Sequence, residues 1–208
     1  MALQGNPING PDLIFGDNLD NYINALDGDD TVFGNGGNDF IEDSSGPNSG
    51  NDVFFGDRGN DTLYGWAGND DLHGGGGNDY LDGYSGNAFS KEYDVLTGSS
   101  LNIFGDGQDT FGLGFSGYPM YYQKAVFAMI TDFNGADRFS SSGDRILLGG
   151  SASQYKFTYE DRSSLGTMSG SNNPLIKDTI IRSASNPSDI IGIVEDINIV
   201  GADVFTYV

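Results

Sequence analysis

Acidic residues recur at a fixed spacing in the first half of the chain, and carboxylates arranged in this way can bind metal ions. Between Gly56 and Asp82 the sequence repeats with a period of nine, as GDRGNDTLY, GWAGNDDLH and GGGGNDYLD. The three repeats share Gly-Asn-Asp, which places Asp61, Asp70 and Asp79 at equivalent positions. A unit that cannot bury its own apolar residue must stack on a copy of itself, so the repeat predicts a stacked array.

The same step extends in both directions from these repeats, with four extra residues before Asp52 and six extra before each of Asp94 and Asp109. The anchor residues are Asp12, Asn21, Asp30, Asp39, Asp52, Asp61, Asp70, Asp79, Asp94 and Asp109. The residue two positions after each anchor is large and apolar: Ile14, Ile23, Val32, Ile41, Phe54, Leu63, Leu72, Leu81, Leu96 and Phe111. Glycine stands two positions before the anchor in most units, the exceptions being Leu19 and Glu92.

A strand of about three residues with its middle side chain inward, followed by a turn of about six, would position these anchors. Two such units complete one coil, and successive coils stack roughly 4.8 Å apart as parallel sheets. We therefore expect an all-β, two-sheet parallel solenoid over residues 1–111. The anchors then form two columns, one of Asp12, Asp30, Asp52, Asp70 and Asp94, the other of Asn21, Asp39, Asp61, Asp79 and Asp109.

Bare columns of this kind would oppose folding, because carboxylates ~5 Å apart repel by about 3 kcal/mol at an effective dielectric constant of 20. Hard divalent cations between the coils would reverse that effect, and calcium fits best because it accepts six to eight oxygen ligands in adaptable geometry. Softer metals would require His or Cys, which are nearly absent. We expect several calcium ions, bound by the aspartate anchors with Asp27 and Asp57 and by turn carbonyls near Gly28, Gly37, Gly56, Gly59, Gly65, Gly68, Gly74, Gly76 and Gly77.

A second interpretation is that Gly, Asn and Asp only form turns between antiparallel strands. Ordinary hairpins do not keep a nine-residue register with an apolar residue always two positions after the anchor, so the pattern favours the solenoid.

Composition excludes several classes of protein. The net charge is -21 with nine basic residues, so nucleic acid and anionic membrane surfaces are not expected partners. Cysteine is absent, which excludes disulfides and thiolate metal sites, and no apolar run is long enough for a transmembrane helix. The N-terminus lacks the basic and apolar regions of a cleavable signal peptide, so the signal was removed, export uses another signal, or the protein stays inside.

The segment Gly74 to Asp82 matches G-G-x-G-x-D-x-U-x at every position, and units resembling it extend from Gly10 to Phe111. This pattern resembles the repeats-in-toxin, or hemolysin-type calcium-binding, family. The resemblance implies a calcium-filled parallel β-roll, extracellular use, and type I export directed by an uncleaved C-terminal signal. It also implies a chain that is unfolded at low cytosolic calcium and folds outside the cell.

Residues 112–208 differ in character from the repeats. We expect strands near residues 125–133, 144–148, 155–159, 179–182, 190–194 and 204–208, and no convincing helix. The segments ITDFNGADRF, GDRILLGGSASQY, DIIGIV and FTYV resemble the C-terminal cap of cyanobacterial hemolysin-type proteins. This suggests a β-rich capping and export region, in which Asp132, Asp137 and Asp144 are expected to be solvated loop charges more than calcium ligands.

Motifs for catalysis are missing from the sequence. A zinc protease of this repeat class needs HExxH, yet the only histidine is His73. There is no G-x-S-x-G segment for a serine nucleophile and no phosphate-binding loop. We expect no enzymatic activity.

Aromatic residues recur at outward strand positions. One sheet would display Phe15, Phe33 and Phe55 in a stripe, and the other Tyr22, Phe40 and Tyr80. Aligned exposed aromatics mark an interaction surface or a surface that another part of the chain covers. Two interpretations stay open: the C-terminal half folds back over one face, or the face contacts another copy in a homo-oligomer or fibre.

Three functions remain compatible with these observations. The first is a secreted calcium-dependent structural protein that self-associates as a filament, surface layer or matrix. The second is a calcium-dependent adhesion or glycan-binding module, and the third is the calcium-binding secretion module of a toxin-like protein. We expect the third least, because 208 residues leave little room for an effector domain.

Overall fold

The computed structural model is built almost entirely of short strands. It describes residues 7–43, 49–83, 92–99, 107–113, 127–133, 143–160, 177–195 and 204–208. The strands of the repeats are β1 (Leu13–Phe15), β2 (Tyr22–Asn24), β3 (Thr31–Phe33), β4 (Phe40–Glu42), β5 (Val53–Arg58), β6 (Thr62–Tyr64), β7 (Asp71–Gly76), β8 (Tyr80–Asp82), β9 (Tyr93–Ser99) and β10 (Thr110–Gly112). The later elements are β11 (Phe127–Ile130), β12 (Arg145–Leu148), the 3₁₀ helix η1 (Ala152–Gln154), β13 (Tyr155–Glu160), β14 (Asp178–Ser183), β15 (Ile190–Val194) and β16 (Phe205–Tyr207).

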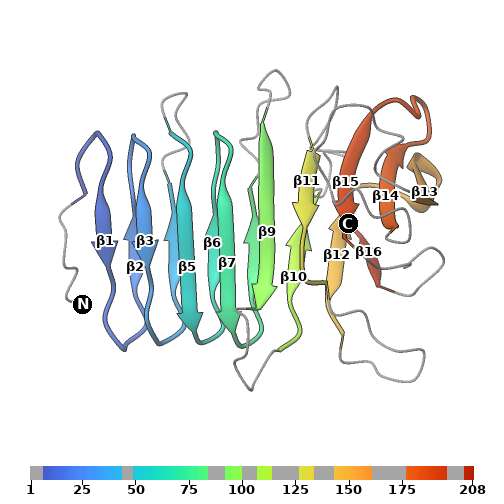
Figure 1. Cartoon of the computed structure of the whole chain (residues 1–208). Helices are drawn as coiled ribbons and strands as arrows, with labels where there is room; N and C mark the ends of the chain where they lie inside the picture. The colour runs from blue at the N-terminus through green and yellow to red at the C-terminus, as the bar shows by residue number, and fades with distance from the viewer. Residues whose placement is uncertain are drawn as a thin grey trace.

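Consecutive strands of the repeats alternate between two sheets, which confirms the predicted parallel β-roll. One sheet has the order β1-β3-β5-β7-β9-β11-β15-β14-β13, and the other has the order β16-β12-β10-β8-β6-β4-β2 (Figure 1). All pairs among β1 to β12 are parallel and in register, so that Val32 pairs with Phe54 and Ile41 pairs with Leu63. Each coil therefore places equivalent residues of its two repeats directly over those of the preceding coil.

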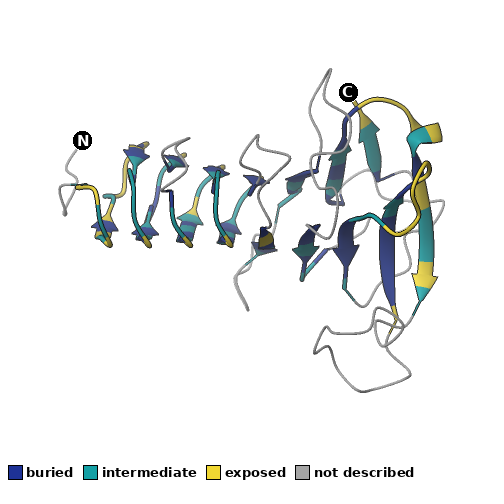
Figure 2. Cartoon of the chain, turned by 90° about the horizontal axis from the view of Figure 1, so that it is seen from above, coloured by how far each residue is buried: buried dark blue, intermediate teal, exposed yellow. Residues whose placement is uncertain are grey.

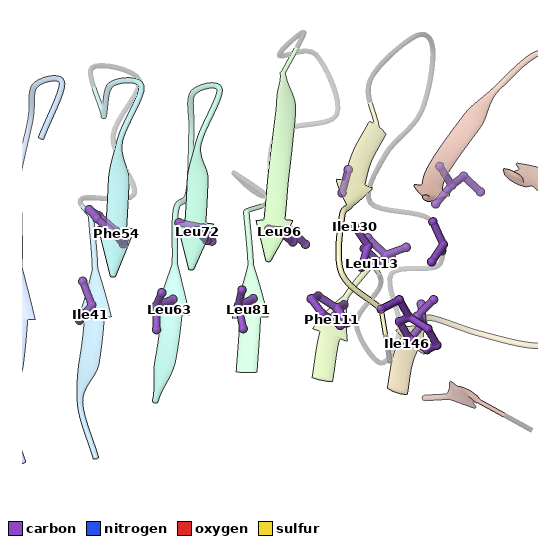
Figure 3. Close-up of a cluster of buried hydrophobic side chains, with 14 of the residues drawn as sticks. Ile41, Phe54, Leu63, Leu72, Leu81, Leu96, Phe111, Leu113, Ile130 and Ile146 are labelled. Carbon is purple, nitrogen blue, oxygen red and sulfur yellow. The ribbon is translucent and has the colours of Figure 1, made fainter. Parts of the chain in front are cut away.

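The core runs along the axis of the roll. The apolar residue two positions after each anchor is fully buried in every unit, from Ile14 to Phe111. In Figure 3 the side chains of Ile41, Leu63 and Leu81 form one row, and those of Phe54 and Leu72 form a second row opposite it. Because alternate side chains of a strand point to opposite faces, a three-residue strand buries its middle residue and leaves its neighbours at the surface.

The second half of the chain continues the roll at one end (Figure 1). Strand β11 pairs in parallel with β9, and β12 pairs in parallel with β10. The antiparallel strands β15, β14 and β13 then complete the first sheet, while β16 completes the second. Each of the six stretches predicted to be a strand contains one. A separate folding unit beginning at residue 112 stays a prediction, because both sheets run on past that point. Among the described residues, no helix is long and apolar enough to cross a membrane.

Candidate metal sites in the turns of the roll

The turn before each anchor brings backbone carbonyl groups of successive coils close together. The glycine two positions before the anchor has positive φ in several units, for example 136° at Gly59, 151° at Gly68 and 136° at Gly77. A Cβ atom at Gly59 would collide with the carbonyl oxygen of Gly37, and one at Gly77 would collide with that of Gly59. Glycine is required here because no other residue combines this backbone conformation with so close an approach.

The anchor side chains form two hydrogen-bonded columns, as the register of the repeats predicts. In the first column the backbone N–H of Asp12 donates to Oδ1 of Asp30 at 2.7 Å, and that of Asp30 donates to Oδ1 of Asp52 at 2.8 Å. The first column continues through Asp70 to Asp94. The second column runs by the same contact through Asn21, Asp39, Asp61, Asp79 and Asp109. One oxygen of each linked carboxylate therefore joins its coil to the coil before it.

The second carboxylate oxygen has a different environment. Oδ2 of five anchors is buried and has no hydrogen-bond donor: Asp30, Asp39, Asp52, Asp61 and Asp70. All five side chains are at most 2% exposed. Buried polar atoms normally have a partner, so a row of orphaned acceptors indicates that a cation is needed beside them.

Glycines at the start of each turn leave room beside these oxygens. A Cβ atom at Gly56 would lie 2.5 Å from the carbonyl oxygen of Gly74 and would collide with Oδ2 of Asp61. The same substitution at Gly74 would place Cβ 2.5 Å from Oδ2 of Asp79 and 2.6 Å from the carbonyl oxygen of Gly98. A side chain at these positions would thus fill the space between the anchor carboxylate and the backbone carbonyl group of the next coil. Both of these groups are hydrogen-bond acceptors.

Burial raises the pKa of these carboxyl groups well above the ordinary value of an aspartate. The pKa of Asp61 rises to about 7 and that of Asp70 to about 10, mainly through desolvation and further through neighbouring carboxylates. The pKa of Asp30 and that of Asp39 each rise to about 6, again mainly through desolvation. In the folded columns burial therefore favours the protonated form of these groups, whereas a bound cation would favour the ionised form.

The donor set fits calcium. Among the described residues no three acidic or histidine side chains converge on one point, so an ion in a column would have to take many of its ligands from backbone carbonyl oxygens. Calcium accepts such mixed oxygen sets at high coordination number, whereas magnesium requires a strict octahedron and retains its waters. When bound, calcium would supply positive charge between the coils, held by the anchor carboxylates and the turn carbonyls.

The remaining predicted ligands lie in several settings. Asp94 and Asp109 are buried members of the columns, each 1% exposed. Asp12, at the first coil, accepts the N–H of Ile8 through Oδ2 at 2.7 Å. Asp27 and Asp57 are only partly buried and do not belong to either column, so their role as ligands stays a prediction. The carbonyl of Gly76 accepts the N–H of Gly59 at 2.9 Å as part of the backbone ladder between coils.

Some buried acidic residues of the described chain were not predicted as ligands, among them Asp43, Glu92 and Asp144. Asp43 and Glu92 are each 1% exposed and lie beside the first column, next to two of the insertions. Asp144 is 2% exposed and accepts the N–H of Asp109 at 2.9 Å, so it extends the second column. The expectation of a solvated loop charge is therefore wrong for Asp144, and Ile146 two positions later carries the signal that would have identified it. Asp132 accepts the N–H groups of Gly98 and Ser99, and Asp137 lies outside the described residues.

Comparison with protein families agrees with this geometry. The family model described as the RTX calcium-binding nonapeptide repeat matches residues 9–42 and 47–81, in four copies. A search of curated proteins found no match. The matched segments contain anchors of both columns, from Asp12 to Asp79, and repeats of this family bind several calcium ions in a parallel β-roll. Residues 9–42 and 47–81 are therefore RTX calcium-binding nonapeptide repeats.

Proposed function

We propose that the chain is a non-enzymatic, secreted calcium-binding protein that folds when calcium binds and then self-associates as a structural component of a filament, surface layer or matrix. The observation that carries the proposal is the row of buried carboxylate oxygens without a donor, in Asp30, Asp39, Asp52, Asp61 and Asp70.

Coupling between calcium and folding follows from the electrostatics of the columns. Equivalent carboxylates of neighbouring coils are separated by about one strand spacing, roughly 4.8 Å, and each ionised pair repels by about 3 kcal/mol at an effective dielectric constant of 20. Several such pairs exceed the net stability of a typical domain, about 5–15 kcal/mol. Calcium binds the folded columns and not the separated aspartates of an unfolded chain, so it stabilises the roll by mass action.

Outward aromatic side chains on the nine-stranded sheet support self-association. The rings of Phe15, Phe33, Phe55 and His73 stack in a row, with centroid separations of 5.3, 4.8 and 4.7 Å and interplanar angles of at most 9°. The described C-terminal strands continue the sheets beyond β9 and β10 and do not lie over this row (Figures 1 and 2). An outward row of aromatic rings of this kind is typical of an interaction surface.

The seven-stranded sheet carries a second aromatic row, with one residue that was not predicted. The rings of Tyr22 and Phe40 lie 5.6 Å apart, and Tyr64 lies 5.6 Å from both Phe40 and Tyr80. The sequence pattern places Thr62 in this row. In the structure the ring of Tyr64, at the far end of the same strand, lies next to the rings of Phe40 and Tyr80. Together with the first row, this supplies aromatic contacts on both outer faces of the roll.

The ring geometry favours a protein partner over a glycan for the first row. Sugars stack on open aromatic faces, whereas the faces of Phe33 and Phe55 are covered by their neighbours within the row. The ring edges are what remain available, and edge contacts with further aromatic rings are favourable. A second copy of the chain presents a matching row, which supports self-association.

Circular dichroism tests the folding part of the proposal. We expect the spectrum of a β-sheet protein in millimolar calcium and that of an unfolded chain after EDTA is added, with recovery when calcium is restored. Identical spectra in the two conditions would contradict the proposal.

Sedimentation velocity in millimolar calcium tests self-association. Replacement of both Phe33 and Phe55 by threonine should shift the protein toward monomers, because the rows would lose their central rings. Threonine is the suitable replacement, since Thr97 occupies the same row on β9. Equal sedimentation of the wild type and the double variant would refute a role for this row.

A further inference from the structure

The turn between β4 and β5 carries an acidic residue at a position where the other turns along the same edge of the roll usually carry a small residue. The N–H of Asp43 donates to the carbonyl of Tyr64 at 3.2 Å. Gly65 makes the equivalent contact with Asp82 at 2.9 Å. Asp43 and Gly65 are thus successive members of one row of residues at the start of the turns.

Members of this row face the carboxylate of the next anchor. A Cβ atom at Gly83 would lie 2.6 Å from Oδ2 of Asp94, and one at Gly65 would lie 2.8 Å from Cγ of Asp70. Asp43 has such a Cβ atom and a carboxylate in addition. The four extra residues of this turn, which fall between Asp43 and Asp52, distinguish it from the regular repeats.

The two carboxyl groups of this turn lie against each other in a buried environment. Asp43 is 1% exposed and Asp52 is fully buried. By the geometry of this row the carboxylate of Asp43 lies beside that of Asp52, and its charge adds to the burial that raises the pKa of Asp52. Oδ2 of Asp52 nevertheless has no donor, and an ionised Asp43 carboxylate would present only acceptor atoms to it. Ser49, itself 1% exposed, donates its hydroxyl to Oδ2 of Asp43 and holds that carboxylate in place.

Two carboxylates in contact and away from water need a proton or a cation between them. Repeats of this family bind calcium along such a column. An added carboxylate raises the negative charge of the ligand set, which strengthens calcium binding. A shared proton is the competing explanation.

We propose that Asp43 adds a carboxylate, which the nonapeptide pattern does not provide, to the calcium site of Asp52, and that the ion bound there binds more tightly than those between the regular coils. The inference rests on calcium binding by the columns. It assigns a ligand role to a residue that stands outside the repeat motif.

The test is calcium retention by the full chain. The protein is saturated with calcium, dialysed against buffers of decreasing free calcium set by a chelator, and assayed for bound calcium by atomic emission. In the wild type we expect most of the bound calcium to be released at one free-calcium concentration. About one ion per chain should remain bound until the free-calcium concentration is roughly tenfold lower. Asp43→Asn and Asp43→Gly should lose this last ion while retaining the others and the folded spectrum in saturating calcium. Glycine is suited to this position because Gly65 and Gly83 occupy the same row.

Asp71→Asn is the matched control, because it removes one acidic charge from a partly exposed position that faces His73 and does not belong to either column. It should behave as the wild type. Retention of the tight ion by both Asp43 variants would overturn the inference. It would also be overturned if the Asp43 variants folded at lower free-calcium concentrations than the wild type, which is the result expected if the two carboxylates share a proton. If the wild type binds no calcium at all, the proposed function fails as well, which is a different outcome from the loss of one class of site.

Discussion

Alanine substitutions at the neighbouring residues Gly36 and Gly37 should change stability in opposite directions. Gly37 has φ 108°, and an added Cβ atom would lie 2.6 Å from the backbone nitrogen of Asp20 and 2.7 Å from the carbonyl oxygen of Leu19. Gly36 does not have positive φ, and the nearest atom to its Cβ would be 3.5 Å away. The two positions therefore share a turn but differ in conformation and space.

The expected magnitudes follow from these differences. An L-residue in a left-handed conformation costs about 1–2 kcal/mol, and the clash with the backbone of the preceding coil adds to that cost. We expect Gly37→Ala to lower the free energy of unfolding by at least about 2 kcal/mol, which is roughly a 30-fold change in the equilibrium constant. Gly36→Ala should raise it by about 0.4–1 kcal/mol, because alanine restricts the unfolded chain.

Urea unfolding of the calcium-loaded protein, followed by circular dichroism at one fixed free-calcium concentration, provides the comparison. Calcium must be held constant, since stability depends on its concentration by mass action. The reasoning would be refuted if both variants lost the same stability, or if Gly37→Ala were as stable as the wild type.

Further outcomes follow from the core and from the buried carboxyl groups. Leu72→Ala should lower the free energy of unfolding by about 2–5 kcal/mol, because Leu72 is fully buried. Leu13→Ala should change it little, because Leu13 is 56% exposed. Urea titration of both variants would show whether burial decides the effect. Because the calcium-free fold raises the pKa of Asp61 to about 7 and that of Asp52 to about 8, it binds more protons than the unfolded chain and loses stability as pH rises from about 4 to about 8. Because those protons substitute for calcium, circular dichroism should show the calcium-free chain more folded at pH 5 than at pH 8, whereas in saturating calcium the folded fraction should not depend on pH over that range. Equal folding of the calcium-free chain at both pH values would count against the buried columns.

Much of the fold follows from sequence periodicity. The apolar residue two positions after each anchor predicts the interior correctly from Ile14 to Phe111, because a three-residue strand can bury only its middle side chain. The nine-residue step likewise predicts which anchors share a column. These features are local in the sequence and repeat unchanged, so pattern alone is sufficient.

The features that the pattern does not predict lie where the repeat is interrupted. Asp43 and Glu92 stand next to insertions, where the nine-residue step no longer indicates which residues are buried. Asp144 belongs to the second column but is separated from Asp109 by 35 residues. Tyr64 joins the aromatic row diagonally, through a side chain long enough to reach rings on both neighbouring strands. Such contacts depend on side-chain reach and on three-dimensional proximity, neither of which follows from spacing.

The most direct test of the central claim is the anomalous difference density of crystals grown with calcium. We predict peaks in the turns of the roll, beside Oδ2 of anchors such as Asp61 and Asp70 and within coordination distance of turn carbonyl oxygens. Density for calcium only at the outer surface, with the two columns of buried carboxylates free of metal, would contradict the account.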